Sequence, residues 1–294
     1  MAKKGIDVSK HNGIIDWNRV KESGKVDFVM LRAGYGKLSS QKDSMFEKYY
    51  AGAKAVGLPV GCYWYSYAMT EEEARQEADA FLEVIKGKQF EYPVYYDVEE
   101  DKQFKLGKAK VSKIIRAFLE RVESKDYWVG LYGSYSSLTT FTELDIRDRY
   151  AIWLAHWNVK KSPYMGQYGM WQYGVGRIPG ITGDVDVDEC YEDYPTLIKD
   201  AGDNGFVKDS KPVEVTPAPA NNGTYPIPTR VIKEGDTGED VKWVQSMLKA
   251  KGYYSGSIDG SFGILTLGAI LAFQFKNGLE VDGVCGPKTR GALK

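Results

Sequence analysis

The sequence patterns of a strand, a helix and a second strand follow one another in residues 59–98, PVGCYWYSYAMTEEEARQEADAFLEVIKGKQFEYPVYYDV. Pro59–Tyr67 is rich in aromatic residues, which favours a strand. In Glu71–Ile85 apolar residues recur every three or four positions, the spacing of an amphipathic helix, and the hydroxyl of Thr70 suits its N-cap. Pro93–Val98 predicts the second strand. The segment is therefore predicted to form a strand–helix–strand unit.

The same alternation extends to both sides of this segment. Short β-type runs predict eight strands, and helical patterns fall between the first five of them. This order is typical of an α/β fold, a β/α barrel with eight strands and a helix-poor end. In such barrels the chemistry lies at the C-terminal ends of the strands. The predicted strands are Gly5–Val8, Phe28–Arg32, Pro59–Tyr67, Pro93–Val98, Trp128–Tyr132, Ala151–Ala155, Gly169–Tyr173 and Val185–Val187, and the predicted helices are Met45–Val56, Glu71–Ile85 and Lys108–Glu123.

The composition changes after the predicted barrel. Residues 202–230 contain five of the eleven prolines and predict an extended tether. Beyond it, IDGSFG at 258–263 recurs 23 residues later as VDGVCG at 281–286, each followed by a threonine and an alanine. Asp-Gly predicts a tight turn and threonine a helix start, so we expect a small all-α module. The predicted division is a barrel at 1–201, a Pro-rich linker at 202–230 and the module at 231–294.

Charge and composition argue against several classes of protein. The formal net charge is −1, whereas a nucleic-acid binder carries a basic excess, so no nucleic-acid partner is expected. Three widely spaced cysteines and two histidines predict neither a metal site nor another cofactor. No apolar run approaches the ~18 residues of a spanning helix, so membrane insertion is not expected. Nothing in the sequence indicates an obligate protein partner.

Two further features of the composition concern the ligand and the cellular compartment. Aromatic residues reach 13% and include 21 Tyr; in a near-neutral chain they suit either a core or a neutral, ring-shaped ligand. The N-terminus, MAKKGIDVSKHNG, has no apolar stretch after its lysines. We therefore expect a chain made in the cytoplasm without a signal peptide, which needs another route to act outside. A dyad of Cys62 with a histidine stays open, although a packed cysteine is the commoner state in an apolar strand.

Two acids end the second strand of the opening segment. Asp97 and Glu99 lie two positions apart in YPVYYDVEE, residues 92–100, so on a strand their side chains share one face. Carboxylates are poor strand formers, and two of them on one face indicate a site. The alternative is an ordinary exposed strand end.

Two more acids fall on the first and last predicted strands. Asp7 and Asp186 are expected to join the central pair, because the first and last strands of a closed barrel are neighbours. Repulsion and burial in such a group raise at least one pKa, as a general acid requires near neutral pH. Arg32 is expected to pair with an acid of this group, a surface ion pair being the alternative. Asp184 and Asp188 are interpreted as solvated loop charges.

The predicted barrel contains a set of short motifs in a fixed order. They are GIDVSKHNG (5–13), FVMLRAG (28–34), GLPVGCYWY (57–65), YYDVE (95–99), and WQY (171–173) through PGITGDVD (179–186). Together they resemble glycoside hydrolase family 25, the Chalaropsis-type lysozymes, over nearly all of residues 4–195. The resemblance implies a barrel that cuts the β-1,4 bond between N-acetylmuramic acid and N-acetylglucosamine in peptidoglycan.

The resemblance also implies a role for each acid. Glu99 matches the general acid that protonates the leaving oxygen. Asp97 matches the partner that steadies the 2-acetamido group of the substrate while that group attacks the anomeric carbon, which gives net retention. Asp7 and Asp186 match acids that support this pair. The departures, such as Tyr65 where Phe is usual, replace none of these four carboxylates.

Aromatic and amide side chains near the strand ends are candidates for sugar binding. Tyr63 matches a family site position, Tyr132 ends the fifth strand, and Trp157 follows the sixth. All three are expected to contact sugar rings. Tyr35 and Gln172 are further candidates, for which packing in the core or rim is the alternative.

Residues 233–294 resemble the peptidoglycan-binding type 1 module, on KEGDTGEDV (233–241), the Asp-Gly repeats and the positions between them. The two resemblances together imply an endolysin-type N-acetylmuramidase that binds bacterial peptidoglycan and acts at the cell wall after release. A bacterial enzyme released by an unconventional route is the alternative on origin. A non-catalytic wall-binding protein and a glycosidase acting on chitin are the alternatives on function.

Overall fold

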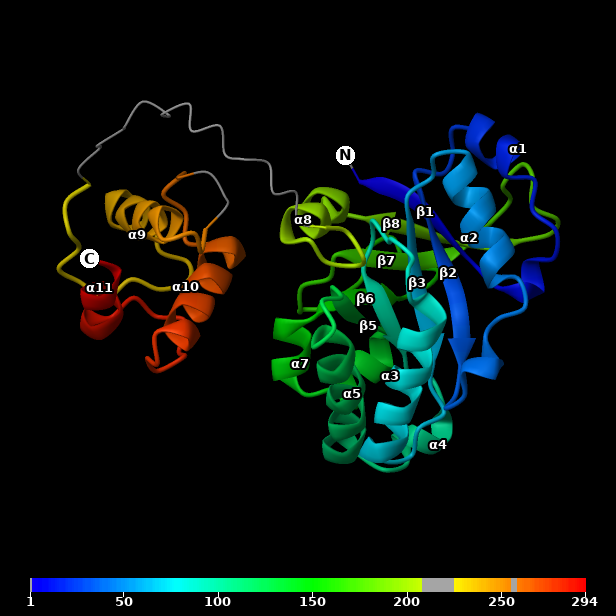
Figure 1. Cartoon of the computed structure of the whole chain (residues 1–294), viewed down its shortest axis with the longest axis horizontal. Coiled ribbons are helices and arrows are strands. Elements are labelled where there is room, and N and C mark those ends of the chain that lie inside the picture. Colours follow the sequence, from blue (N-terminus) through cyan, green and yellow to red (C-terminus); the bar gives the residue numbers. More distant parts are fainter. Residues whose placement is uncertain (1, 208–224, 255–257) are drawn as a thin grey trace. The chain divides into compact units, whose positions relative to one another are not determined.

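Eight strands close into a barrel in the N-terminal part of the chain (Figure 1). The computed structural model describes residues 2–207, 225–254 and 258–294. Strands β1 to β7 run parallel, and β8 is antiparallel to both of its neighbours, β7 and β1. The predicted α/β barrel is confirmed. Its strands are β1 Lys3–Val8, β2 Phe28–Tyr35, β3 Val60–Tyr65, β4 Val94–Asp97, β5 Val129–Ser134, β6 Ala151–Ala155, β7 Met170–Gly176 and β8 Val185–Cys190.

Helices surround the first part of the barrel and are missing from the last part. None of the described residues between β6 and β8 forms a helix, so the expected helix-poor end is present. Helix α3 begins and ends where the periodicity predicted. The short helices that flank β1, β5 and β8 were not predicted, because they span at most eight residues and show little periodicity. The helices are α1 Trp17–Glu22, α2 Phe46–Ala55, α3 Glu71–Ile85, α4 Asp101–Phe104, α5 Lys108–Glu123, α6 Tyr135–Thr140, α7 Leu144–Arg149 and α8 Tyr194–Ala201.

The two faces of each strand belong to two different cores. On β4, Val94 and Tyr96 point outward into the layer between sheet and helices, where Tyr96 stacks on Phe118 with ring centroids 3.7 Å apart. Tyr95 points into the barrel, into a second cluster of buried residues. Because side chains alternate along a strand, Asp97 also faces inward. Strand β4 therefore places the carboxyl of Asp97 inside the barrel.

Glycines make room for large rings at the closed end of the barrel interior. A Cβ on Gly5 would lie 2.2 Å from the ring of Phe28, and one on Gly130 would lie 2.5 Å from the ring of Tyr95. Trp153 packs edge-on against Tyr95 in the same layer. This end is filled with side chains, so the site has to lie at the other end.

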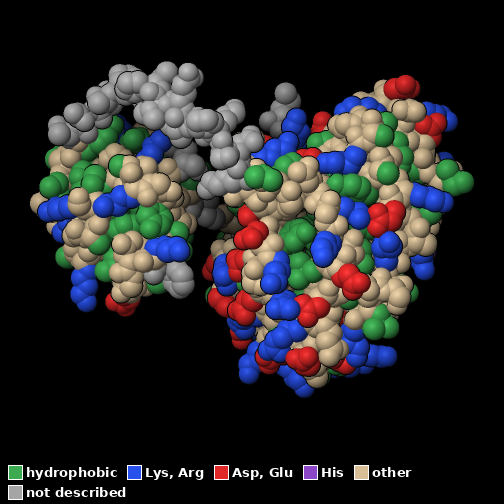
Figure 2. Space-filling model, in the orientation of Figure 1, with side chains coloured by type: hydrophobic (Ala, Val, Ile, Leu, Met, Phe, Trp, Pro, Cys, Tyr) green, Lys and Arg blue, Asp and Glu red, His purple; other side chains and the backbone are tan. Residues whose placement is uncertain are grey.

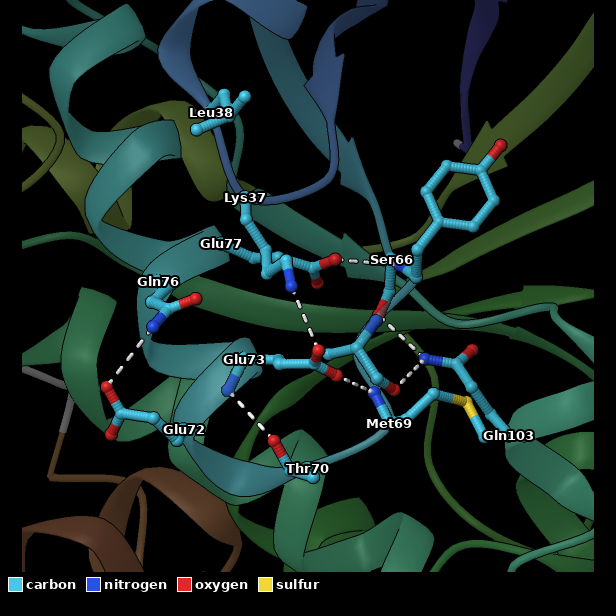
Figure 3. A network of polar contacts seen from close by, with 12 residues as sticks. Lys37, Leu38, Ser66, Met69, Thr70, Glu72, Glu73, Gln76, Glu77 and Gln103 are labelled. Atoms are coloured by element: carbon cyan, nitrogen blue, oxygen red, sulfur yellow. Dashed lines mark hydrogen bonds and ion pairs between the residues drawn. The ribbon is translucent and has the colours of Figure 1, made fainter.

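The start of α3 is capped as predicted. The Thr70 hydroxyl accepts a hydrogen bond from the backbone N–H of Glu73 at 3.2 Å. The Glu73 carboxylate in turn accepts one from the backbone N–H of Met69 at 2.8 Å (Figure 3). These bonds satisfy amide groups that a helix start leaves unpaired, and they fix the segment between β3 and α3.

The barrel unit continues past the predicted start of the linker. Gly202 ends α8 in the left-handed conformation, and Asn204 is fully buried. The Asn204 side chain accepts a hydrogen bond from the Trp128 backbone N–H at 2.8 Å and donates to the carbonyls of Phe90 and Tyr92. Residues 202–207 therefore belong to the fold, although their polar composition placed them in the linker. The greater part of the predicted linker, 208–224, lies outside the described residues.

Among its described residues, the C-terminal unit contains three helices and has a core of its own. They are α9 Glu239–Ala250, α10 Ile264–Lys276 and α11 Pro287–Leu293. The chain divides into two compact units between residues 211 and 212. The small module with helices that the repeat predicted is therefore present.

One buried glutamine organises each copy of the Asp-Gly repeat. The Gln245 amide donates to the Asp259 carboxylate at 2.8 Å and to Thr266 at 3.1 Å, and its oxygen accepts from the Gly260 N–H at 2.9 Å. Gln274 makes the equivalent bonds in the second copy, to Asp282, Thr289 and Gly283. Each copy of the repeat therefore forms an Asp-Gly turn that a buried glutamine stabilises by hydrogen bonds.

The surface of the barrel unit carries mixed charge. Figure 2 shows acidic and basic side chains interspersed over the region of α3 and α5. Many of them are paired, as in Arg121 with Asp79 at 2.7 Å and Arg75 with Glu71 at 3.7 Å. Within the part of the chain that the structure describes, no helix has both the length and the apolar character needed to cross a membrane.

Candidate active site

The two central acids stand at the C-terminal end of β4. Asp97 is the last residue of the strand and is only 3% exposed, inside the barrel. Glu99 follows two residues later, in the turn that leads to α4, and is exposed. The shared strand face that the sequence predicted does not form, because the strand ends at Asp97. One acid is thus buried and the other reaches solvent beside it.

Asp7 and Asp186 lie directly opposite each other on neighbouring strands. Asp7 is near the C-terminal end of β1, and its register partner on β8 is Asp186. Because β8 is antiparallel, its N-terminal start lies at the same edge of the barrel as the C-terminal ends of the other strands. The charges of Asp186 and Glu99 both act on Asp7. The structure therefore brings together all four acids that the sequence singled out.

A fifth carboxyl joins the group and corrects the sequence interpretation. Asp188 is fully buried, and its Oδ1 accepts a hydrogen bond from the indole N–H of Trp153 at 2.8 Å. It is not a solvated loop charge, because it lies on β8 two residues after Asp186 and so points to the same side of the strand. The alternation in Val185-Asp-Val-Asp188 was the signal that could have revealed it. Asp184, by contrast, is exposed and pairs with Arg177 at 3.1 Å.

Arg32 pairs outside this group. Its guanidinium contacts the buried carboxylate of Asp43 at 2.7 Å. Asp43 also accepts hydrogen bonds from the backbone N–H groups of Lys10 and Met45. The expected pair with an acid of the cluster is therefore wrong, although the charge of Arg32 still lowers the pKa of Asp97.

Burial raises the pKa of every carboxyl in the cluster above its ordinary value. The charge of Asp186 adds to this for Asp7 and for Glu99. For Asp97 the second cause is the charge of Glu99. Since like charges and burial both disfavour ionisation, the group as a whole is expected to hold protons to higher pH than free carboxyls do. The five acids are Asp7, Asp97, Glu99, Asp186 and Asp188.

Gln172 connects one acid to two of the predicted sugar-binding rings. Its amide nitrogen donates to Asp7 at 2.8 Å, and its oxygen accepts from the Tyr132 hydroxyl and from the Trp157 indole, both at 2.9 Å. Gln172 is only 4% exposed, so its polar atoms serve these three neighbours. Trp157 is 43% exposed and presents a free ring at the mouth, whereas Tyr132 is largely buried.

The remaining candidate rings lie on β2 and β3. Tyr63 is half-buried inside the barrel and packs edge-on against Trp153 with centroids 5.8 Å apart. Tyr35 is half-buried and contacts Tyr67 at 6.0 Å. Tyr67 is 50% exposed and also contacts Tyr65, whose hydroxyl donates to Glu100 at 3.0 Å. The sequence reasoning missed Tyr67, although it continues the alternation of Tyr63 and Tyr65.

A pocket of about 590 Å³ opens beside Glu99. The stacked rings of Phe104 and Phe141, with centroids 4.9 Å apart, form its apolar part. Ser134 and Ser136 at the start of α6 supply hydroxyl groups, and Lys105 supplies a cation. The pocket has the mixed polar and apolar lining that a sugar requires. Among the residues described, no group of three or more His, Cys, Asp or Glu side chains is arranged so that it could hold a metal ion.

A closed barrel with a group of acids and aromatic rings at its open end belongs to the class of barrel glycoside hydrolases. Comparison with known proteins specifies the family. The chain belongs to glycosyl hydrolases family 25, whose model matches residues 6–181. Residues 237–293 match the model of a peptidoglycan binding domain. These matches confirm the resemblances inferred from the sequence.

Relatives and solved structures agree with this assignment. The chain is 30% identical to the autolytic lysozyme of Clostridium acetobutylicum, over 99% of this chain and 71% of that protein. The lysozyme from Streptomyces coelicolor is 25% identical with a TM-score of 0.58, over 68% of this chain and 97% of that one. The autolysin LytC from Streptococcus pneumoniae, solved with a synthetic peptidoglycan ligand, is 32% identical with a TM-score of 0.56, over 65% of this chain.

The chain spans 47% of the length of LytC. The family and the lysozyme relatives confirm the predicted glycoside hydrolase of the lysozyme type.

Proposed function

We propose that this chain is an endolysin-type N-acetylmuramidase, which hydrolyses the β-1,4 bond between N-acetylmuramic acid and N-acetylglucosamine in bacterial peptidoglycan. The observation that carries this proposal is the arrangement of Asp97 and Glu99. One carboxyl is buried at the end of β4, and the other is exposed two residues later with a raised pKa. A glycosidase needs such a pair, with one acid to protonate the leaving group and a second group to stabilise the charge on the sugar.

Glu99 is the general acid in this mechanism. Although the residue as a whole is exposed, the protein around its carboxyl partly removes that group from water, and this raises its pKa, as does the charge of Asp186. Glu99 therefore keeps its proton to higher pH than a free glutamate. It is also the acid of the cluster that is exposed, which a group needs in order to reach a bound chain. Glu99 donates its proton to the glycosidic oxygen as the bond to the leaving sugar breaks. In the second step it takes a proton from the attacking water.

Asp97 orients the acetamido group of the sugar on the other side of the bond. Within the described residues its Oδ1 is buried without a hydrogen-bond partner. A buried acceptor of this kind is costly unless a donor arrives with the substrate. The acetamido N–H is such a donor. With that N–H held, the acetamido oxygen attacks the anomeric carbon, and water later opens the cyclic intermediate, so the configuration is retained.

The C-terminal unit holds the enzyme at its insoluble substrate. Its likeness to a peptidoglycan binding domain and its separate core support a binding role. Two linked binding units raise the effective concentration of the barrel near the wall. We place the site of action at the bacterial cell wall, reached after release from the cytoplasm.

The test is the chemistry of the new chain ends. Purified peptidoglycan is digested, reduced with borohydride and analysed by mass spectrometry. Reduced muramic acid at the new ends is the expected result. Reduced glucosamine ends would overturn the choice of bond, and cleavage of chitin in place of peptidoglycan would favour the chitinase alternative. Wall binding without new ends would make the chain a non-catalytic binding protein.

A further inference from the structure

A carboxylate is buried behind the site, on the outer side of the barrel wall. Glu77 lies on α3 among Ala74, Ala78 and Phe81 and is fully buried. A charged group in an apolar layer is costly unless it is paired and hydrogen-bonded. No cation contacts it in the described structure; its neighbours are hydroxyl and N–H groups. The position is one that helix periodicity reserves for an apolar side chain.

The hydrogen bonds of Glu77 all lead to the segments that carry the site. One carboxylate oxygen accepts from the Tyr67 backbone N–H at 2.8 Å, just after β3. The other accepts from the Tyr96 hydroxyl at 2.6 Å. Tyr96 precedes Asp97 on β4, and its side chain points to the opposite face of the strand.

The network continues to α4, on the far side of Glu99. The Ser66 hydroxyl donates to the Tyr96 hydroxyl at 2.7 Å and accepts from the Gln103 amide at 2.8 Å. The same amide donates to the Ala68 carbonyl at 2.8 Å. Figure 3 shows Glu77 and Gln103 on either side of the segment that contains Ser66. Gln103 is only 1% exposed, so these bonds are made away from water.

Glu99 therefore sits on a short segment that is tied at both ends. At one end the Asp97 carbonyl accepts from the Ser66 backbone N–H at 2.9 Å. At the other end the Gln103 backbone N–H donates to the Glu100 carbonyl at 2.9 Å, and the side-chain amide of Gln103 donates to the Ser66 hydroxyl. A side chain is positioned well when the residues around it are themselves locked by packing and hydrogen bonds.

The donors in this network all run in one direction. Gln103 donates to Ser66, Ser66 to Tyr96, and Tyr96 to Glu77. The chain of donors ends on a carboxylate, which accepts on both oxygens and donates on neither. A glutamine of the same shape has one acceptor and one donor side. It would have to reverse the whole chain or leave a buried group unpaired.

We propose that Glu77 is a positioning residue for the reaction, which holds the segment between β4 and α4 so that the Glu99 carboxyl lies at the correct place beside Asp97. This proposal rests on the proposed function, in which Glu99 is the general acid. Glu77 does not touch the substrate and acts through Tyr96, Ser66 and Gln103.

The test compares Glu77→Gln with Glu72→Gln on soluble, uncross-linked peptidoglycan chains. Glu72 is exposed on the same helix, so it controls for the loss of one acid from α3. For Glu77→Gln we expect kcat to fall about 10- to 100-fold with little change in KM, since a displaced catalytic group loses rate before binding. Glu72→Gln keeps the wild-type values.

The pH profile separates positioning from simple loss of stability. A loosened segment exposes the Glu99 carboxyl further to water and moves it away from the charge of Asp186, so the pKa of Glu99 falls. The alkaline limb of kcat then moves to lower pH in Glu77→Gln. The groups that face Glu99 and set this limb are Asp7, Tyr65, Asp97, Glu100, Tyr132 and Asp186.

Two further variants keep the proposal falsifiable. Gln103→Met removes the bonds to Ser66 and Ala68 while keeping the volume of the side chain, and it decides the question if Glu77→Gln does not fold. We expect the same shift of the alkaline limb. In the double variant Glu77→Gln with Tyr96→Phe, the losses in kcat are smaller than the product of the single losses, because both act on one network.

The proposal is overturned if the folded Glu77→Gln or Gln103→Met enzyme keeps the wild-type kcat and pH profile. It is also overturned if the losses in the double variant multiply. The proposed function fails separately, if the wild-type enzyme itself releases no muramic acid ends.

Discussion

At the scale of single residues, Asp186 acts on the general acid through its charge. Burial raises the pKa of Glu99 and the charge of Asp186 raises it further, so the protonated acid persists to higher pH. Activity that needs this proton is lost as the pH rises through that pKa. We expect Asp186→Asn to move the alkaline limb of kcat/KM to lower pH. Asp184→Asn, which removes an exposed charge paired with Arg177, should leave the limb in place. An unchanged limb in Asp186→Asn would contradict the assignment.

Because its pKa is raised by burial, Asp188 is expected to lower the stability of the fold near neutral pH. Its pKa is raised well above the ordinary value by burial and by the charge of Asp7. The stability linked to such a group is complete below its unfolded pKa of ~3.9 and is lost as the pH rises through the folded pKa. Asp188→Asn keeps the acceptor for Trp153 and removes the charge. We expect it to raise the free energy of unfolding at pH 7 by about 1–2 kcal/mol.

Denaturant titrations at two pH values check this prediction. The gain from Asp188→Asn should shrink toward zero as the pH falls below the unfolded pKa of ~3.9, because there both states of the wild-type protein hold the proton. An equal effect at both pH values would mean that packing, and not charge, decides the stability at this position.

At the scale of elements, the barrel depends on small residues that face inward. A Cβ on Gly130 would lie 2.4 Å from the backbone oxygen of Ala151, which cannot move without breaking the sheet. On Gly176 the nearest atom is a methyl group of Val187 at 3.0 Å. We expect Gly130→Ala to lower the free energy of unfolding by about 3 kcal/mol or more, and Gly176→Ala by less than about 1 kcal/mol. Thermal unfolding of the two variants measures the difference, and equal losses would refute it.

Elements with a strong local signal were predictable from the sequence, and those set by tertiary contacts were not. Helix α3 has both a cap and a periodic apolar face, and its observed bounds are the predicted ones. The antiparallel direction of β8 has no local signal, since it depends on which strand edges are left to close the barrel. Residues around Asn204 have the polar composition of a linker. One buried side chain and its three hydrogen bonds hold them in the fold, and such contacts leave no pattern in the sequence.

The residues of the candidate site can likewise be divided into those that the sequence made predictable and those that it did not. Asp97 and Glu99 are conspicuous, because acids are unusual in an apolar strand, and their position beside Asp7 and Asp186 follows from closure of the barrel. Gln172 was a candidate for sugar contact with packing as the alternative, and its side chain bonds Asp7, Tyr132 and Trp157. Such a role depends on three strands meeting in space, so spacing along one strand does not contain it.

At the scale of the whole molecule, each unit has its own core. The buried clusters of the barrel and of the C-terminal unit share no residue. Cutting the chain between them removes no buried contact within either cluster. Each unit is therefore expected to fold without the other.

Deleting residues 231–294 should separate binding from catalysis. We expect the shortened enzyme to keep the wild-type rate on soluble chains and to lose 10²-fold or more in apparent affinity for intact walls, in the range that linked binding units contribute. A matched variant, Gln245→Leu in the full chain, leaves buried groups of the Asp-Gly turn unpaired and should weaken wall binding at unchanged length. Wall-binding isotherms and rates on soluble chains measure both effects. Loss of activity on soluble chains in either variant would mean that the C-terminal unit takes part in the reaction as well as in binding.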